Sequence, residues 1–352
     1  MTPAALSLTA RTLYAELREL ALVAGTSGHV GPMPGAVVGK TVKGKAYLYF
    51  QYRDLDGRTR QAYLGPDDVQ TRSLATRIAE RATERSGDVE HLDELRAAFI
   101  GAGGAAMEHA PMRVLQGFAE AGVLQPGVGR AVLIGTHAFN VLGNLLGVRW
   151  TSRMQTQDVD LGGEADIDIA LGTPSAPASD VLQKLGMGFI PVPTLDPSAP
   201  STSFRVRGKE LRVDLLVPLT GKPDARPVFV PALNSVAQPV RFLDYLLEES
   251  VPAVATGRRA LVLLNVPAPE RFALHKLLVA ESRPAALAVK ASKDREQAMQ
   301  LIEALIENAP DGVAAAKADL VRRGKGWSDK LSRALKKARR GHAGAVEFVE
   351  QL

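Results

Sequence analysis

The spacing of apolar and polar residues predicts that the N-terminal third of the chain is mostly helical. Leu13, Leu17 and Leu20 recur at helical spacing and give residues 5–24 an apolar face. Further helices are expected at 67–100 and 105–123. We place a domain boundary near residue 110, so that residues 1–110 form an N-terminal region.

A different pattern, alternating in steps of two, interrupts these helices at residues 39–65. Two strand-like runs flank Asp56-Gly57, a residue pair typical of tight turns, and this predicts a β-hairpin. The preceding "GAVVGKT" at 35–41 resembles a phosphate-binding P-loop. That loop has one residue too few, Pro34 stands where a glycine is expected, and a hairpin follows in place of a helix, so we reject this interpretation.

The central pattern is that of an α/β unit. Residues 129–139 read as a short apolar strand, a glycine turn and the start of a helix that continues to about Leu146. A strand with Asp158, a helix at 180–189 and a hairpin at 201–218 around Gly208 follow. We therefore expect a core with a mixed sheet at 111–238.

The pattern turns helical again after about residue 240. Helices are expected at 241–249, 269–281, 292–308 and 312–340. The predicted fold class is α/β (α+β), in which the mixed-sheet core follows a helical and β-hairpin region and precedes a C-terminal helical domain, 239–352.

Composition narrows the class of protein without identifying it. The chain has 352 residues, of which 46% are hydrophobic and 23% charged, as in ordinary globular proteins. No run approaches the ~20 apolar residues of a membrane span, so we expect no membrane association. The N-terminus is amphipathic and carries acids, unlike a signal peptide, and we expect a cytoplasmic protein. Because cysteine is absent, disulfides and thiolate zinc sites are excluded.

Positive charge is concentrated in two stretches. The whole chain has a formal net charge of +5. Residues 321–341 hold nine Lys or Arg against one acid, and the 39–65 hairpin interleaves basic residues with tyrosines. Such patches suit a polyanion such as RNA or DNA. A solvated helix face and a soluble hairpin are the alternative explanation, and the sequence leaves both open.

A strand-to-helix turn at Gly135-Thr136 is a candidate phosphate site. Free N–H groups and the helix dipole at such a turn favour an anionic phosphate. Glycine allows close approach of the backbone, and the threonine hydroxyl adds a donor.

Acids on two strands are candidate metal ligands. Asp158 and Asp160 fall on one face of their strand, and Asp214 lies in an otherwise apolar strand, where an unpaired acid is costly. Three such carboxylates could hold two Mg²⁺ or Mn²⁺ ions and leave positions open for triphosphate oxygens. Asp166 and Asp168 repeat the D-x-D pattern, but we interpret this second pair as acids on a solvated face.

The order strand, Gly-Thr turn, helix, D-x-D and later single Asp resembles the DNA polymerase β nucleotidyltransferase superfamily. The segments "VLIGTHAFNVLGNLLGV", "TQDVDL", "RVDLLVP" and "PERFALHKLLVAESRP" followed by "KASKDREQAMQLIEAL" resemble a bacterial family of this fold. That family is related to type IV toxin–antitoxin toxins of the abortive-infection and MenT kind. The "YLYFQYRDLDGRTRQAYLG" hairpin is also similar to the family's N-terminal region.

The resemblance implies further site residues. The relatives' lysine corresponds to Lys276, and their basic-Asp pair to Lys293-Asp294. Their usual arginine is replaced here by Lys293, which keeps the charge but loses the bidentate fork. His137 and His275 are interpreted as structural residues or as residues that support the metal ligands, not as ligands themselves. The sequence has no His-x₃-His spacing that would favour zinc.

The resemblance also implies an activity, metal-dependent transfer of a nucleoside monophosphate from an NTP to an acceptor with release of pyrophosphate. The toxin relatives point to RNA, namely tRNA 3′ ends, as acceptor and to an antitoxin as a protein partner. A protein hydroxyl is an equally compatible acceptor. A non-catalytic nucleotide- or RNA-binding module and an interaction protein are the alternatives from other classes.

Overall fold

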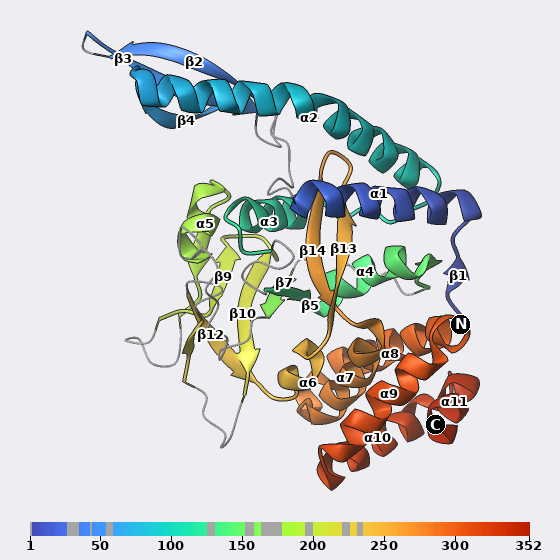
Figure 1. The fold of residues 1–352 in the computed structure, drawn as a ribbon. Helices are drawn as coiled ribbons and strands as arrows, with labels where there is room; N and C mark the ends of the chain where they lie inside the picture. The colour runs from blue at the N-terminus through green and yellow to red at the C-terminus, as the bar shows by residue number, and fades with distance from the viewer. Residues whose placement is uncertain are drawn as a thin grey trace.

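The computed structural model describes most of the chain (Figure 1). It describes residues 2–26, 35–42, 44–53, 59–124, 131–151, 158–162, 178–193, 200–219, 226–230 and 235–352. Among these residues we found no helix with the length and apolar character needed to cross a lipid bilayer. The mixed α/β fold class is confirmed.

The N-terminal region combines two helices with a small antiparallel sheet. Its elements are β1 (Ala4–Ala5), α1 (Leu8–Thr26), β2 (Gly35–Val42), β3 (Lys45–Arg53), β4 (Thr59–Pro66) and α2 (Val69–Gly101). The predicted hairpin is confirmed as β3 and β4, although its turn at 54–58 lies outside the described residues. The structure adds β2 as a third strand, and the rejected P-loop segment lies within it.

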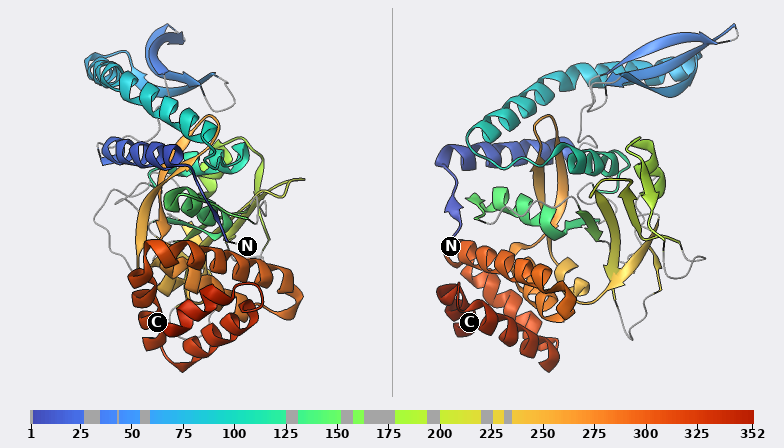
Figure 2. Two further views of the ribbon diagram at one scale, coloured as in Figure 1. Left: turned by 90° about the vertical axis from the view of Figure 1, so that its right-hand side faces the viewer. Right: turned by 180° about the vertical axis from the view of Figure 1, so that it is seen from behind.

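α2 connects this small sheet to the body of the molecule. Its C-terminal half packs on α1 through a cluster that includes Leu95, Phe99 and Leu17. The Arg96 guanidinium also donates to the carbonyl of Gly257, in the turn of a distant hairpin. The N-terminal half of α2 carries the β2–β3–β4 sheet away from the body (Figures 1 and 2).

The central sheet is mixed, with strand order β11-β12-β10-β7-β5-β14-β13, and β8 and β9 extend it beside β10. Its strands are β5 (Val132–Ile134), β7 (Asp158–Gly162), β8 (Phe189–Pro191), β9 (Ser203–Val206), β10 (Arg212–Pro218), β11 (Val228–Val230), β12 (Ser235–Val240), β13 (Ser250–Thr256) and β14 (Leu261–Pro267). The accompanying elements are α3 (His109–Glu120), α4 (Gly135–Leu146), β6 (Val148–Arg149), α5 (Ala178–Lys184) and α6 (Leu243–Leu247). The predicted hairpin around Gly208 is confirmed as β9 and β10.

The β13–β14 hairpin is the main departure from the predicted elements. The pattern after residue 240 indicated helices, yet these strands continue the central sheet past that point. Both faces of the hairpin are covered: Val254 and Leu263 pack against α1 and α2, whereas Val262 and Leu264 belong to the main core. A strand buried on both faces has no polar alternation, so its period is not visible in the sequence.

The C-terminal region is helical from residue 269 onward. Its elements are α7 (Pro269–Ser282), the short 3-10 helix η2 (Ala285–Leu287), α8 (Ala288–Asn308), α9 (Pro310–Arg322), α10 (Lys325–Ala338) and α11 (Ala343–Gln351). The single helix expected at 312–340 is therefore wrong, because the chain turns at Gly324, where φ is +117°. Such a positive φ is readily available to glycine but cannot continue a right-handed helix.

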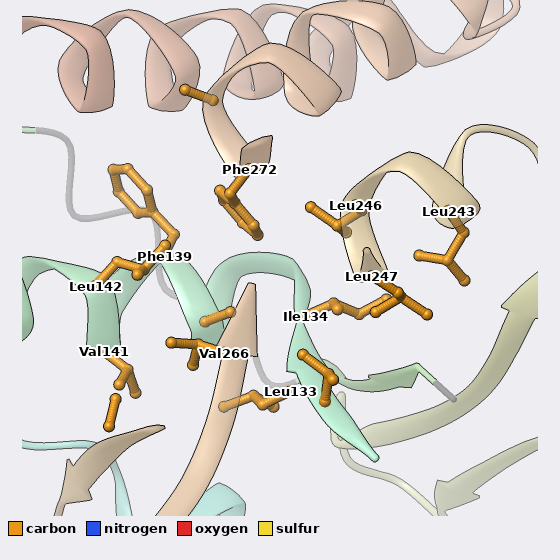
Figure 3. Packing of buried hydrophobic residues seen from close by; sticks show 14 of the residues in the cluster. Leu133, Ile134, Phe139, Val141, Leu142, Leu243, Leu246, Leu247, Val266 and Phe272 are labelled. Carbon is orange, nitrogen blue, oxygen red and sulfur yellow. The ribbon is translucent and has the colours of Figure 1, made fainter. Parts of the chain in front are cut away.

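The first turns of α7 pack directly over the β5–α4 segment. Phe272 lies beside Phe139 and Ile134 in one apolar cluster that also contains Leu246 and Val266 (Figure 3). These side chains are buried, so the C-terminal helices and the central sheet share one core. This packing brings α7 and α8 to the end of the sheet where α4 begins.

Candidate active site

α4 starts without a connecting loop at the end of β5. Gly135 is the first helical residue and has φ of +73°, a conformation that side chains with a Cβ adopt only with strain. Among the described residues, no side chain caps this helix N-terminus. The first N–H groups of α4 can therefore serve an anionic group, as the sequence predicts for Gly135 and Thr136.

The strands that carry the predicted metal ligands are neighbours in the sheet. β10 runs parallel to β7, and Asp214 is in register with Asp160. β5 runs antiparallel to β7 on its other side, where Ile134 is paired with Asp160. Gly135 therefore follows directly on a residue in register with Asp160, and the turn and the two acidic strands meet at one place.

Asp158 also lies in β7, in register with Arg212. The side chains of Asp158 and Asp160 are outside the part that the structure describes, as are Asp166, Asp168 and residues 152–157. The described side chains, which do not include those of Asp158 and Asp160, contain no cluster of three potential metal ligands. The structure thus places the strand carrying these two acids but describes the side chain of Asp214 alone.

Asp214 is held by a neighbouring cation. The Arg212 Nε donates to Asp214 Oδ1 over 2.8 Å and to the Ser203 hydroxyl over 2.8 Å. An acid of this kind is an oxygen ligand suited to Mg²⁺, and the register with Asp160 supplies a second acidic residue beside it. The residues present therefore fit a divalent cation, provided that Arg212 releases the carboxylate.

Lys276 and Asp294, predicted from the family resemblance, form a buried ion pair. Lys276 Nζ donates to Asp294 Oδ1 over 2.8 Å, and Arg283 Nε donates to Asp294 Oδ2 over 2.6 Å. Burial disfavours the charged carboxylate, but the two cations outweigh it and hold the pKa of Asp294 below its ordinary value. Lys276 also lies 5.4 Å from the centroid of the Phe272 ring. Arg283 has no counterpart in the sequence prediction, because an arginine after a helix end gives no signal of its target.

Two buried histidines lie beside these cations. Burial and the nearby charge of Lys293 lower the pKa of His137 to about 4, and burial and Lys276 lower that of His275 to about 3. Neither imidazole has a hydrogen-bond partner among the described residues. Lys293 on α8 is therefore close enough to affect His137, which lies in the first turn of α4. The cations of α7 and α8 thus lie on the same side of the molecule as the Gly135 turn.

Of the comparisons with known proteins, the one with family models gave a match. Searches of curated proteins and of solved structures gave no match. A family model described as nucleotidyltransferase matches residues 109–322, from the first turn of α3 to the end of α9. This stretch is more than half of the chain and contains the Gly135 turn, β7, β10 and the Lys276–Asp294 pair. The chain belongs to this nucleotidyltransferase family.

Proposed function

We propose that the protein catalyses metal-dependent transfer of a nucleoside monophosphate from an NTP to an acceptor hydroxyl. The observation that carries the proposal is the register of Asp214 with Asp160, next to a strand whose end leads into the Gly135 turn. Carboxylates and a phosphate-binding turn in one place are what this transfer requires. The order of these motifs also supports a place in the DNA polymerase β superfamily.

Each group has a distinct role in this proposal. Asp158, Asp160 and Asp214 hold Mg²⁺ or Mn²⁺, which when bound favours an ionised attacking oxygen and neutralises charge on the leaving group. The N–H groups of Gly135 and Thr136 bind the β- and γ-phosphates. Lys276 and Lys293 provide positive charge toward the phosphates, and Asp294 fixes the position of Lys276.

The bond changes are those of in-line substitution at the α-phosphorus. The acceptor oxygen forms a bond to the α-phosphorus as its proton passes to solvent, and the bond from this phosphorus to the bridging oxygen breaks. Pyrophosphate leaves with the electron pair. Catalysis of this kind depends mostly on positioning and electrostatic stabilisation.

For the acceptor we propose RNA, with a tRNA 3′ end as the specific form and a toxin neutralised by an antitoxin as the biological role. The resemblance to toxin nucleotidyltransferases and the basic stretches at 39–65 and 321–341 support this choice. A protein hydroxyl is the second candidate acceptor, because the chemistry of the proposed transfer is the same for a ribose hydroxyl and a side-chain hydroxyl.

The test is incubation of the purified protein with each α-³²P-labelled NTP, Mg²⁺ or Mn²⁺ and total bacterial RNA, followed by RNA and protein gels. We expect label on RNA that disappears in the Asp158→Ala and Asp160→Ala variants and without divalent cation. Circular dichroism should show that these variants remain folded.

The other outcomes are equally informative. Label on a polypeptide would replace RNA by a protein acceptor. Nucleotide binding without label on either gel would contradict the proposed transfer and favour a binding module. A fully active Asp158→Ala or Asp160→Ala variant would exclude the proposed metal site.

A further inference from the structure

A group of aromatic and basic side chains lies on the β2–β3–β4 sheet, away from the Gly135 turn (Figure 1). The added Cβ of a substituted Gly65 would lie 2.6 Å from the Thr71 hydroxyl of α2, so the sheet face containing Gly65 is the one that α2 covers. Leu48 is in register with Gly65 and belongs to the same face. Tyr47 and Tyr49 flank Leu48 in β3 and therefore belong to the opposite face.

That opposite face carries three tyrosines, of which Tyr63 contacts the other two. The Tyr63 ring centroid lies 5.4 Å from that of Tyr49 and 6.0 Å from that of Tyr47. Tyr63 is 57% exposed, although tyrosine is a residue of intermediate burial in globular proteins. We name the group Lys40, Tyr47, Tyr49 and Tyr63 the tyrosine face.

Positive charge accompanies the rings. Lys40 is in register with Tyr47, and its Nζ lies 5.5 Å from the centroid of the Tyr49 ring. Lys45, at the start of β3, is also exposed. Residues 35–66 contain six Lys or Arg and two Asp, so this sheet attracts a polyanion.

We propose that the tyrosine face binds single-stranded RNA. Unpaired bases stack on exposed aromatic rings of a sheet, and neighbouring cations contact the phosphates. A duplex keeps its bases stacked on each other and cannot use the rings in this way. A polypeptide partner fits less well, because the rings are accompanied by lysines, which are depleted at protein–protein interfaces.

The inference rests on the proposed function for the choice of RNA as the acceptor. The tyrosine face holds a single-stranded segment of the acceptor while its 3′ end reaches the transfer site. α2 carries the sheet at one end and packs on the body at the other, so this helix connects the two surfaces (Figure 2).

The test is binding of a fluorescent single-stranded RNA to the full chain, measured by anisotropy without nucleotide. We expect Tyr63→Ala to raise Kd about tenfold, within the range for loss of one stacked base. Tyr63→Phe keeps the ring and should bind as the wild type does. Phe229→Ala is the matched control, since Phe229 is 58% exposed and lies in β11 of the central sheet.

Two further measurements separate stacking from general charge attraction. Lys40→Gln should reduce the slope of log Kd against log salt by about 0.7, the value for one contact to single-stranded phosphate. Unlabelled duplex RNA of the same length should compete poorly. Equal competition by duplex, or equal losses in Tyr63→Ala and Phe229→Ala, would overturn the proposal.

The Asp214→Asn variant distinguishes this inference from the proposed transfer. It should bind RNA normally while transferring no nucleotide. Tyrosine-dependent binding by a wild type that labels no acceptor would contradict the transfer and leave the tyrosine face intact. If the wild type labels RNA but Tyr63→Ala binds RNA as tightly as the wild type does, the transfer is supported and the tyrosine face is excluded as the RNA-binding surface. Loss of protein labelling by Tyr63→Ala with unchanged RNA binding would assign the face to a polypeptide and overturn the RNA proposal.

Discussion

Lys276 Nζ donates to Asp294 Oδ1 over 2.8 Å, and both residues are buried between α7 and α8. A buried charge without its partner is costly, so each residue depends on the other. Lys276 lies one turn after Phe272, the residue through which α7 packs on the β5–α4 segment. We therefore expect loss of the ion pair to affect both the stability of the protein and the candidate active site.

We predict that Lys276→Met destabilises the protein and abolishes transfer. The loss in unfolding free energy should be about 3 kcal/mol, at the low end for a broken buried ion pair, because Arg283 still contacts Asp294. Urea denaturation measures this change. The double variant Lys276→Met/Asp294→Leu should recover much of the stability and remain inactive, whereas recovery of activity would contradict a role for Lys276 at the phosphates.

The buried histidines predict a loss of stability in mild acid. His275 has a pKa of about 3 in the folded protein, against about 6.5 for an unfolded chain. The unfolded state therefore binds more protons below pH 6.5, and the stability that is complete above this pH declines as the pH falls. The decline due to one such histidine is about 1.4 kcal/mol per pH unit.

Unfolding free energies of the wild type and His275→Asn, measured from pH 8 to 5, test this expectation. The two curves should run parallel above pH 7, and the wild type should fall more steeply below 6.5. Parallel curves over the whole range would mean that His275 is not held neutral in the folded protein.

Gly135→Ala should weaken both the fold and nucleotide binding. At φ of +73° an alanine costs about 1–2 kcal/mol, and any relaxation moves the first N–H groups of α4. Gly122→Ala is the matched control, since Gly122 has φ of +76° and open space around its Cβ position. Thermal unfolding should show similar losses for both variants, while only Gly135→Ala should raise the KM for NTP.

The contact between Arg212 and Asp214 predicts the effect of removing the cation. In Arg212→Gln a divalent ion no longer competes with a guanidinium for this carboxylate. The half-saturating Mg²⁺ concentration in the transfer assay should fall about two- to fivefold, as expected for a partly exposed pair. An increase would instead mean that Arg212 orients Asp214 for metal binding.

Helices and strands with one polar face can be predicted well from the sequence, whereas strands with both faces buried cannot. The Gly135 turn and the β9–β10 hairpin carry glycines and alternation that indicate their conformation directly. The β13–β14 strands carry neither, because α1 and α2 cover one face and the main core the other.

The same reasoning explains which parts of the site could be predicted. Gly135, Asp160 and Asp214 belong to a recognisable order of motifs, so their meeting in the sheet is expected from the resemblance. The Arg283–Asp294 contact depends on how the chain after α7 packs on α8, which residue spacing does not encode. Arg212 and Asp214 are two residues apart on one strand and therefore share a face, so their contact is one that the spacing allows but does not require.

The two-sided β13–β14 hairpin has a consequence for where this protein can be divided. The family match begins at residue 109, but a fragment starting there would uncover the hairpin face that contains Val254, Leu261 and Leu263. Such an apolar strand face in water promotes aggregation. The limits of sequence similarity are therefore not the limits of the packed core, and we expect α1 and the C-terminal half of α2 to unfold together with the nucleotidyltransferase core.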